Sequence, residues 1–258
     1  MKFAKTILAA ASLLAAASLS AQAGDPVRIG IDGAYPPFNQ LTSDGKLIGF
    51  DVDITNALCA EMKVECKFVM QDWDGMIPAV MAGKIDAIVA SMSITEDRLK
   101  KVDFSKKYYN TPSAIAVMKD SELKGESLEE LKGLSIGAQV STTHADFAEK
   151  KIADIDLHLY PTPDEYKLDL ESGRLDGVVD DIVVLSEWVK SEEGACCKIL
   201  MPIKPVPEIH GNGAGIAVKK GNKELADKFS AAIAALRASG KYQEINAKYF
   251  DFDVYGGE

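Results

Sequence analysis

The sequence predicts an α/β fold. Short apolar segments with the composition of strands alternate along the chain with amphipathic segments of helical period, which is the pattern of α/β proteins. No low-complexity segment or long linker interrupts this alternation. Without the first 23 residues, about 235 of the 258 remain, enough for one large domain or for two of ordinary size.

The first half of the chain alternates strands with helices. The clearest helix repeats Val52, Ile54 and Leu58 near helical period, and the next helix ends at Gly83. In order, we predict a strand over 27–32, a helix over 50–62, a strand over 65–71, a helix over 73–83 and a strand over 84–91.

The second half continues the same alternation. A turn-rich crossing over 108–113 leads into an extended segment over 113–119, and a glycine-rich crossing over 211–221 leads into a late strand. Between the crossings we predict strands over 134–140, 156–161, 175–181 and 198–202, with helices near 143–151, 163–172 and 181–190. Helices over 222–238 and 240–248 end the chain.

Residues 1–23 have the pattern of a cleaved export signal. A lysine-bearing start precedes an apolar centre rich in Ala and Leu, and the segment ends on Ala21, Gln22 and Ala23. The apolar part is too short to span a bilayer comfortably. We predict cleavage after Ala23 and a periplasmic protein, with a retained membrane or amphipathic helix as the alternative.

The mature chain is strongly acidic. Loss of Lys2 and Lys5 leaves 27 of the 29 basic residues against 39 acidic ones, a formal charge of −12. Such a surface argues against nucleic acid or anionic lipid as a partner and is compatible with a cationic ligand.

The four cysteines suggest one disulfide and no metal site. Cys59 and Cys66 stand at the end of a predicted helix and the start of a predicted strand, so a bond between them would join the two elements. Cys196 and Cys197 are adjacent, and because a vicinal disulfide is strained we expect two reduced or buried thiols. The histidines show no ligand spacing with the cysteines, and we expect no cofactor.

Two segments echo each other. Residues 86–98 and 134–147 are each a strand followed by Ser and Thr residues and an acidic helix start. Hydroxyls and backbone N–H groups at such a position suit an anion. The alternative is plain capping, since Ser93 and Glu96 have the spacing of a capping box.

Several motifs together give the chain a family resemblance. "RIGIDGAYPPFN" (28–39), "GKLIGFDVDITNALC" (45–59) and "WDGMIPAVMAGKIDAIVASMSITEDR" (73–98) are followed by "VDFSKKYY" (102–109), "SGRLDGVVDD" (172–181) and "KYFDFDVYGG" (248–257). In order and spacing they resemble the periplasmic solute-binding proteins of polar amino-acid ABC transporters, particularly the lysine/arginine/ornithine- and histidine-binding branch. The spacing of Cys59 and Cys66 is similar to the disulfide of that branch.

The resemblance implies a bilobal periplasmic-binding-protein fold (type II), in which two α/β lobes joined by two crossover strands close over an amino acid. Residues 24–111 and 213–258 would form lobe one, and residues 112–212 would form lobe two. The crossings read from composition, near 109–112 and 211–215, fall where the hinges are expected. The implied partners are a small amino-acid ligand and an ABC transporter permease, with the binding protein itself a monomer.

The resemblance also assigns the groups that hold the amino acid. Arg98 suits the ligand carboxylate because its planar fork binds both oxygens. Asp181 would take the α-ammonium. The hydroxyls of Ser91, Ser93, Thr142 and Thr143 would complete the shell around the carboxylate. The alternatives are a surface ion pair for Arg98 and helix capping for Asp181.

A side-chain pocket is implied by three more residues. Asp32 would meet a distal cationic group, and the rings of Tyr35 and Trp73 would sandwich the aliphatic stem, Trp73 adding cation–π attraction. A turn residue at the end of a strand is the alternative for Asp32, and a core or surface aromatic is the alternative for Trp73.

Some positions depart from the family pattern. Ala90 replaces a serine, Trp73 is larger than the usual residue, Gln139 stands where an apolar residue is common, and His144 replaces a frequent Gln. The added polar groups would suit a bulkier arginine derivative such as an opine. His210 would either reach such a group or be a solvated loop side chain.

The predicted function is capture of a cationic amino acid (lysine, arginine, ornithine or histidine) and its delivery to the permease, without catalysis. An enzyme similar to cyclohexadienyl dehydratases is the competing prediction, since fold does not fix function and Asp32, His144 and Asp181 are conceivable acids. A serine hydrolase is disfavoured because neither serine-rich segment is a G-x-S-x-G elbow.

Overall fold

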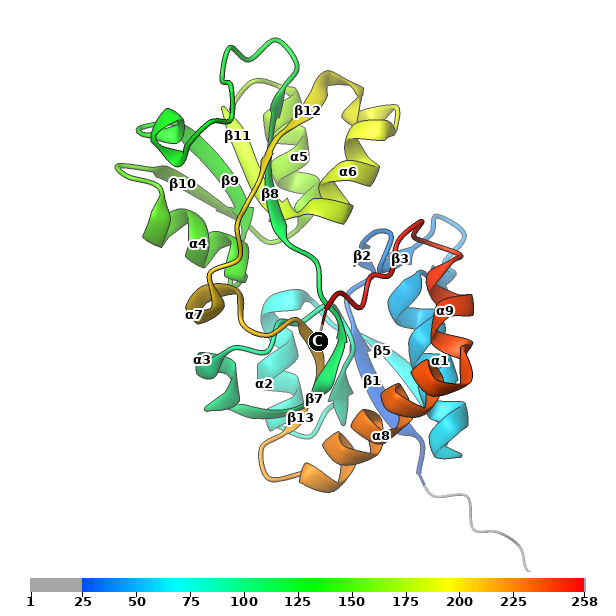
Figure 1. Ribbon diagram of the computed structural model, residues 1–258. Helices are drawn as coiled ribbons and strands as arrows, with labels where there is room; N and C mark the ends of the chain where they lie inside the picture. Colours follow the sequence, from blue (N-terminus) through cyan, green and yellow to red (C-terminus); the bar gives the residue numbers. More distant parts are fainter. Residues whose placement is uncertain (1–24, 258) are drawn as a thin grey trace, which may run out of the picture.

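The computed structural model describes residues 25–257. The export signal predicted over residues 1–23 lies outside the described residues. The described chain is built on two five-stranded mixed sheets, one above the other in Figure 1, each with helices packed around it. The predicted α/β class is confirmed.

The first sheet has the strand order β5-β1-β6-β13-β7. Its strands are β1 (Val27–Ile31), β5 (Cys66–Met70), β6 (Ala87–Ile88), β7 (Val102–Tyr109) and β13 (Ala214–Lys219). β1 is parallel to β5 and β6, whereas β13 runs antiparallel between β6 and β7. The helices of this half are α1 (Phe50–Met62), α2 (Met76–Met81), α3 (Glu96–Leu99), α8 (Lys223–Ser239) and α9 (Lys241–Asn246).

The second sheet has the corresponding order β10-β9-β11-β8-β12. Its strands are β8 (Ser113–Met118), β9 (Ser135–Gln139), β10 (Asp156–Tyr160), β11 (Gly177–Asp181) and β12 (Cys197–Pro202). β9 is parallel to β10 and β11, and β8 is antiparallel to β11 and β12. Around it lie α4 (Thr143–Lys151), α5 (Pro163–Glu171), α6 (Ile182–Lys190), α7 (Pro207–His210) and the 3₁₀ turns η2 (Leu128–Leu131) and η3 (Glu193–Cys196).

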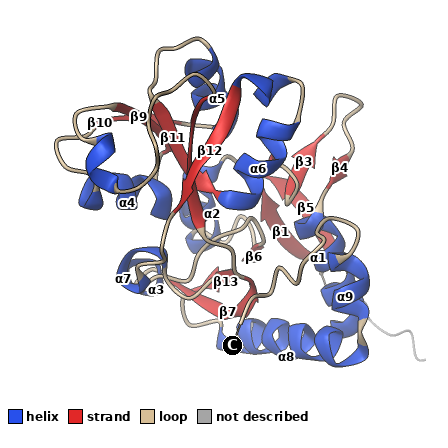
Figure 2. Cartoon of the chain, turned by 45° about the horizontal axis from the view of Figure 1, so that its top comes forward, coloured by secondary structure: helices blue, strands red, loops and turns tan. Residues whose placement is uncertain are grey.

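The chain crosses between the sheets twice, from β7 to β8 and from β12 through α7 to β13 (Figure 1). The C-terminal segment returns to the first crossing, where the Asn110 N–H donates to the Val254 carbonyl over 2.9 Å. Figure 2 shows the two sheets from a second angle, with α8 below the first sheet and α5 beside the second.

The cores explain why the amphipathic helices form where they do. Phe50, Ile54 and Leu58 of α1 are fully buried with Phe229 and Ile233 of α8 in one cluster against the first sheet. Burial of such side chains stabilises the fold by roughly 1.5–3 kcal/mol each. Separate apolar clusters pack on the two faces of the second sheet.

The disulfide prediction is confirmed. Cys59 and Cys66 are bonded, which joins the end of α1 to the start of β5. Cys196 and Cys197 are both free, the first half-buried and the second buried, as the sequence predicted.

Most predicted elements form, and the differences are instructive. The helix over 50–62 has the predicted bounds, whereas the helix over 73–83 divides into the 3₁₀ turn η1 (Trp73–Gly75) and α2. The strand over 84–91 shortens to β6, because only Ala87 and Ile88 pair with neighbours.

Three features were not predicted. β7 forms although Lys106 and Lys107 interrupt its apolar pattern, because it is an edge strand of the first sheet. A small sheet of β2 (Ala34–Tyr35), β3 (Asn39–Leu41) and β4 (Leu47–Ile48) has strands too short for a period to show. The single turn of α7 is likewise too short to show a helical period in the sequence.

Candidate binding cleft

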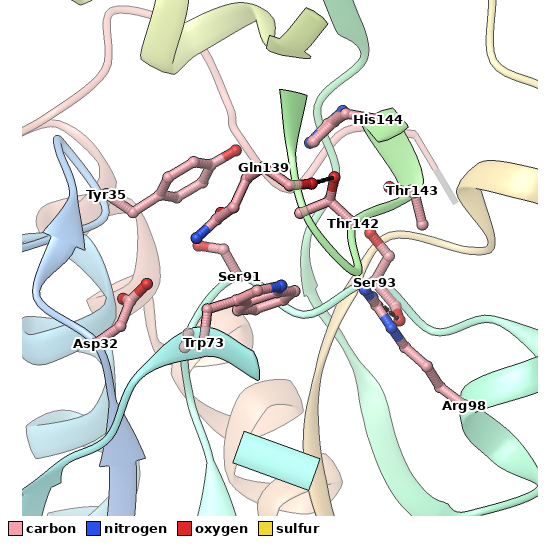
Figure 3. A pocket seen from close by; sticks show the side chains of 11 residues that line it. Asp32, Tyr35, Trp73, Ser91, Ser93, Arg98, Gln139, Thr142, Thr143 and His144 are labelled. Carbon is pink, nitrogen blue, oxygen red and sulfur yellow. Dashed lines mark hydrogen bonds between the residues drawn. The ribbon is translucent and has the colours of Figure 1, made fainter. Parts of the chain in front are cut away.

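A cavity lies between the two sheets. Eleven of the twelve site residues named from the sequence line it (Figure 3): Asp32, Tyr35, Trp73, Ala90, Ser91, Ser93, Arg98, Gln139, Thr142, Thr143 and His144. The twelfth, Asp181, lines an adjoining cavity beside the two crossings, which shares Tyr35, Ser91, Ser93, Thr143 and His144 with the first. We call the first seven residues the first-sheet wall, and Gln139, Thr142, Thr143, His144 and Asp181 the second-sheet wall.

Arg98 is positioned by the short helix α3. The N-cap of α3 is Thr95, whose Oγ1 accepts from the Arg98 N–H at 3.3 Å. The capping box predicted for Ser93 and Glu96 is therefore wrong. Ser93 instead forms an extended bridge with Ala214, which delays the helix start by two residues.

The Arg98 guanidinium lies between the two sheets with capacity for an anion. Nη1 donates to the Ser93 carbonyl at 2.9 Å, Nη2 donates to the Ser141 carbonyl at 3.0 Å, and the group lies 5.4 Å from the Trp73 ring centre. Within residues 25–257 it forms no ion pair with a carboxylate, so the alternative of a surface ion pair is not observed. Burial lowers its pKa to about 10, and the group remains a cation at neutral pH.

Asp32 provides the opposite charge at the end of β1. Its Oδ1 is buried and has no hydrogen-bond partner among the described residues. Burial, followed by the neighbouring Asp51 carboxylate, raises the pKa of Asp32 to about 6. A buried acceptor without a donor costs free energy that a cationic ligand group would recover.

Ser91 is held by a buried group that the sequence did not reveal. Its Oγ donates to Asp51 Oδ2 at 3.1 Å, and its N–H donates to the Tyr108 hydroxyl, which in turn donates to Asp51 Oδ1 at 2.8 Å. Asn39 completes the shell of Asp51 at 2.8 Å. The Ser91 hydroxyl was predicted to help hold the ligand carboxylate, and its hydrogen is directed to Asp51 instead. From the sequence, Asp51 could be read only as an acidic residue in the first turn of a helix, so its role in holding Ser91 was not predicted.

The threonines of the second-sheet wall begin α4. Thr142 Oγ1 donates to the Gln139 carbonyl at 2.7 Å and accepts from the Ala145 N–H at 3.1 Å, so Thr142 is the N-cap. The Gln139 side chain is held in the same way, because its Nε2 donates to the Pro161 carbonyl at 2.9 Å. These bonds fix both side chains before any ligand arrives.

His144 belongs to a buried network around Asp180. Its Nδ1 lies 2.8 Å from Ser113 Oγ and its Nε2 lies 3.2 Å from Asp180 Oδ1. Burial lowers the pKa of His144, against the attraction of Asp180. The neutral ring then donates from Nε2 to Asp180 and accepts at Nδ1 from Ser113. Tyr166 also donates to Asp180. From the sequence, Asp180 was considered only as part of a motif that ends at Asp181.

Asp181 is the N-cap of α6. Its Oδ1 accepts from the Val183 N–H at 2.7 Å and its Oδ2 accepts from Thr111, so the capping alternative is observed. Asp181 also lines the adjoining cavity. Burial raises the pKa of Asp181 to about 7.

His210 differs from the solvated loop residue that was predicted. It ends α7, is half-buried beside Phe147, and its Nε2 is buried without a partner among the described residues. Burial lowers its pKa. It lines the adjoining cavity.

Three hydrogen bonds join the two sides of the cleft. Trp73 Nε1 donates to the Val140 carbonyl at 3.1 Å, the Tyr35 hydroxyl donates to Asp180 Oδ1 at 2.5 Å, and Arg98 Nη2 donates to the Ser141 carbonyl. The backbone acceptors carry no side-chain signal, so sequence reasoning missed them.

A cleft between two sheets, with a cation and a carboxylate oxygen without a partner in one cavity, defines a two-lobed binding protein for a small charged solute. The chain belongs to the bacterial extracellular solute-binding proteins, family 3, whose family model matches residues 27–252. Within residues 25–257 there is no cluster of three His, Cys, Asp or Glu side chains that would hold a metal ion, and no helix long and apolar enough to cross a membrane.

Two relatives and one solved structure show how far the likeness extends. The L-arginine-binding protein of Pseudomonas aeruginosa is 48% identical over 253 residues, 97% of each chain. The histidine-binding periplasmic protein of Escherichia coli (strain K12) is 38% identical over 234 residues, 90% of each. The structure of an ancestral arginine-binding protein bound to arginine matches with a TM-score of 0.80 at 37% identity, over 87% of this chain and 98% of that one.

Proposed function

We propose that this protein captures a cationic amino acid, arginine before others, in the periplasm and delivers it to an ABC transporter permease. The observation that carries the proposal is that one cavity holds both Arg98, which has no ion-pair partner among the described residues, and Asp32, whose Oδ1 has no hydrogen-bond partner there. The 48% identity to an arginine-binding protein, which extends over 97% of the chain, supports arginine as the preferred ligand within the cationic class.

The ligand would lie between these two charges. Its carboxylate would bind Arg98, with hydroxyls from Ser93 and Thr143 beside it, and its guanidinium would bind Asp32. The rings of Tyr35 and Trp73 line the cavity between the two ends.

The α-ammonium would point to the adjoining cavity and Asp181. A positive charge there would favour the ionised carboxylate, whose pKa burial otherwise raises. Ala90, Gln139 and His144 would shape the remaining wall without contributing a formal charge.

Capture would require the lobes to move as units. We propose lobe one as residues 24–111 with 213–258, lobe two as residues 112–212, and hinges at 109–112 and 211–215. Two glycines in the second hinge have left-handed backbones, with φ of +72° at Gly211 and +88° at Gly213. A Cβ on Gly213 would lie 2.7 Å from the Tyr109 carbonyl oxygen of the first hinge, so the two hinge segments approach at a position that admits only glycine.

The other parts of the proposal are cleavage of the export signal after Ala23, a monomer, and a protein without catalytic activity. Two of the three conceivable acids are engaged structurally, since His144 bonds Asp180 and Asp181 caps α6. A second candidate ligand is an arginine-derived opine, favoured by the unpartnered His210 Nε2 in the adjoining cavity.

The test is calorimetric titration of the mature chain, unfolded and refolded to remove any bound ligand. Arginine, lysine, ornithine, histidine, glutamine and an opine would be compared. We expect micromolar or tighter binding of arginine. Binding of neutral amino acids alone would refute the role given to Asp32, and mass spectrometry of untreated protein would identify a ligand carried from the cell.

A further inference from the structure

Two aromatic residues of the first-sheet wall also reach the other side of the cleft. The Trp73 indole N–H donates to Val140, which follows β9, and the Tyr35 hydroxyl donates to Asp180 in β11. Trp73 begins η1 after β5, and Tyr35 lies in β2 after β1. Each donor is therefore carried by the first-sheet side and each acceptor by the second-sheet side.

These bonds depend on how closely the two sides approach. If the two sides rotate about the crossings as rigid bodies, the donors on one side move away from the acceptors on the other, whereas bonds within one side are unaffected. In an open cleft the freed N–H and O–H groups would bond to water, so each bond adds a modest amount to the closed form.

We propose that Tyr35 and Trp73 are positioning residues for lobe closure: their polar hydrogens hold the two sides of the cleft together, separately from the ring faces that line the cavity. The proposal rests on the proposed function, because closure is assigned there to ligand capture. It predicts that ligand release is governed by atoms that do not touch the ligand.

The third cross-cleft bond, from Arg98 to Ser141, cannot separate the two roles. Arg98 is also the proposed anchor of the ligand carboxylate, so its removal would change contact and closure together. Tyr35→Phe is cleaner because it removes one hydroxyl and keeps the ring. Trp73→Phe removes the indole N–H and keeps a smaller aromatic ring.

The experiment measures release of radiolabelled arginine in a chase with unlabelled arginine. We expect Tyr35→Phe and Trp73→Phe each to raise the dissociation rate about fivefold, the worth of a typical hydrogen bond, with the association rate within twofold of wild type. For Tyr35→Phe, the ratios of the arginine, lysine and ornithine affinities should stay unchanged. If the hydroxyl selected among ligands, these ratios would change.

Tyr166→Phe is the matched control. The Tyr166 hydroxyl donates to the same Asp180 carboxylate, from α5 on the same side of the cleft. This variant should lower the melting temperature without changing the dissociation rate. Trp188→Phe provides the same control for loss of a tryptophan outside the cleft.

Two outcomes separate the failures. If wild-type protein retains no labelled arginine, the proposed function fails, and closure is then judged by small-angle scattering of the ligand-free variants, which should have a larger radius of gyration than wild type and Tyr166→Phe. If wild type retains arginine and both variants release it within twofold of the wild-type rate, the positioning role is wrong.

Discussion

The two sides of the cleft use their charged groups differently. On the first-sheet wall, Arg98 has no ion-pair partner and Asp32 Oδ1 has no hydrogen-bond partner within the described residues. On the second-sheet side, Asp180 accepts from two tyrosines and lies against His144, while Asp181 accepts from Thr111 and Val183. A group that already has partners gains less from a ligand. We therefore expect recognition of charge to depend mainly on the first-sheet wall, and the second-sheet wall to present an ordered surface on which the cleft closes.

The turns that lead into the two walls share a backbone feature. Ser91 and Ser141 both leave a strand region with left-handed backbones, at φ +58° and +59°. The internal echo in the sequence thus corresponds to a repeated turn. After it the turns diverge, because Ser91 bonds the buried Asp51 whereas the exposed Ser141 offers its carbonyl to Arg98.

The strongest way to break the comparison is Arg98→Ala. We expect loss of binding of every α-amino acid by at least about 100-fold, because a charge-assisted bidentate contact is lost in a buried site. Titration calorimetry with arginine and glutamine measures it. Arg174→Ala, which removes an exposed arginine paired with Asp169, is the control and should bind normally. Normal binding by Arg98→Ala would show that the carboxylate is held elsewhere.

Asp32→Asn tests the other charge of the same wall. Arginine affinity should fall about 10- to 100-fold, the range for a hydrogen bond to a charged group, while glutamine affinity changes little. Because the pKa of Asp32 is about 6, wild-type affinity for arginine should fall as the pH is lowered from 8 to 5, and this dependence should weaken in the variant. Asp74→Asn, beside Trp73 but exposed, is the control. An equal loss for glutamine would contradict a side-chain role for Asp32.

Asp181→Asn tests the second-sheet wall, where a smaller effect on binding is expected, about tenfold. Asn is as good an N-cap as Asp, so α6 is retained. The folded-state pKa of about 7 exceeds the ordinary 3.8, so this carboxyl stabilises the ligand-free fold only at low pH and loses that contribution as the pH rises through 7. The variant should therefore melt about 3 °C or more above wild type at pH 8, with a smaller gap at pH 5 and none below the ordinary pKa of 3.8.

Calorimetric scans of ligand-free protein at both pH values check this, with the exposed Asp120→Asn as control. A gap that widens at low pH would contradict the assignment of the raised pKa to Asp181.

The smallest effect separates the two turns. Glycine relieves a left-handed backbone that costs other residues roughly 1–2 kcal/mol, and its greater freedom in the unfolded chain offsets about 0.5–1 kcal/mol of this gain. Ser141→Gly should therefore raise the melting temperature by about 1–3 °C. Ser91→Gly gains the same relief but loses the bond to Asp51, so it should melt below Ser141→Gly. Thermal scans of both variants measure this difference. Equal melting temperatures would mean that the bond from Ser91 to Asp51 adds nothing to the stability of the fold.

The sequence predicted the regular elements well because their signals are local. The helix over 50–62 was found from its period and the α/β class from alternation, whereas β2, β3 and β4 are too short to have a period. The split of the helix over 73–83 follows from Trp73 turning toward the cleft, which is a tertiary effect that no local pattern contains.

The site divides in the same way. The residues of the cavity were named through the family resemblance, and the structure brings eleven of them together in one cavity. What the sequence missed are the groups that hold them, namely Asp51 with Tyr108, Asp180 with Tyr166, and the carbonyls of Val140 and Ser141. Burial of a polar residue is set by distant parts of the chain. Every residue has a backbone carbonyl, so the sequence does not show which carbonyl accepts a hydrogen bond.

The place of β13 has a consequence for the order of assembly. This strand comes from residues 214–219 yet pairs with both β6 and β7, in the interior of the first sheet. Every strand of the second sheet precedes it along the chain. A chain growing from its N-terminus therefore contains a complete second sheet while the first still lacks an inner strand. The half that carries the recognising charges is the last to become complete, so a truncated product would lack a finished binding wall.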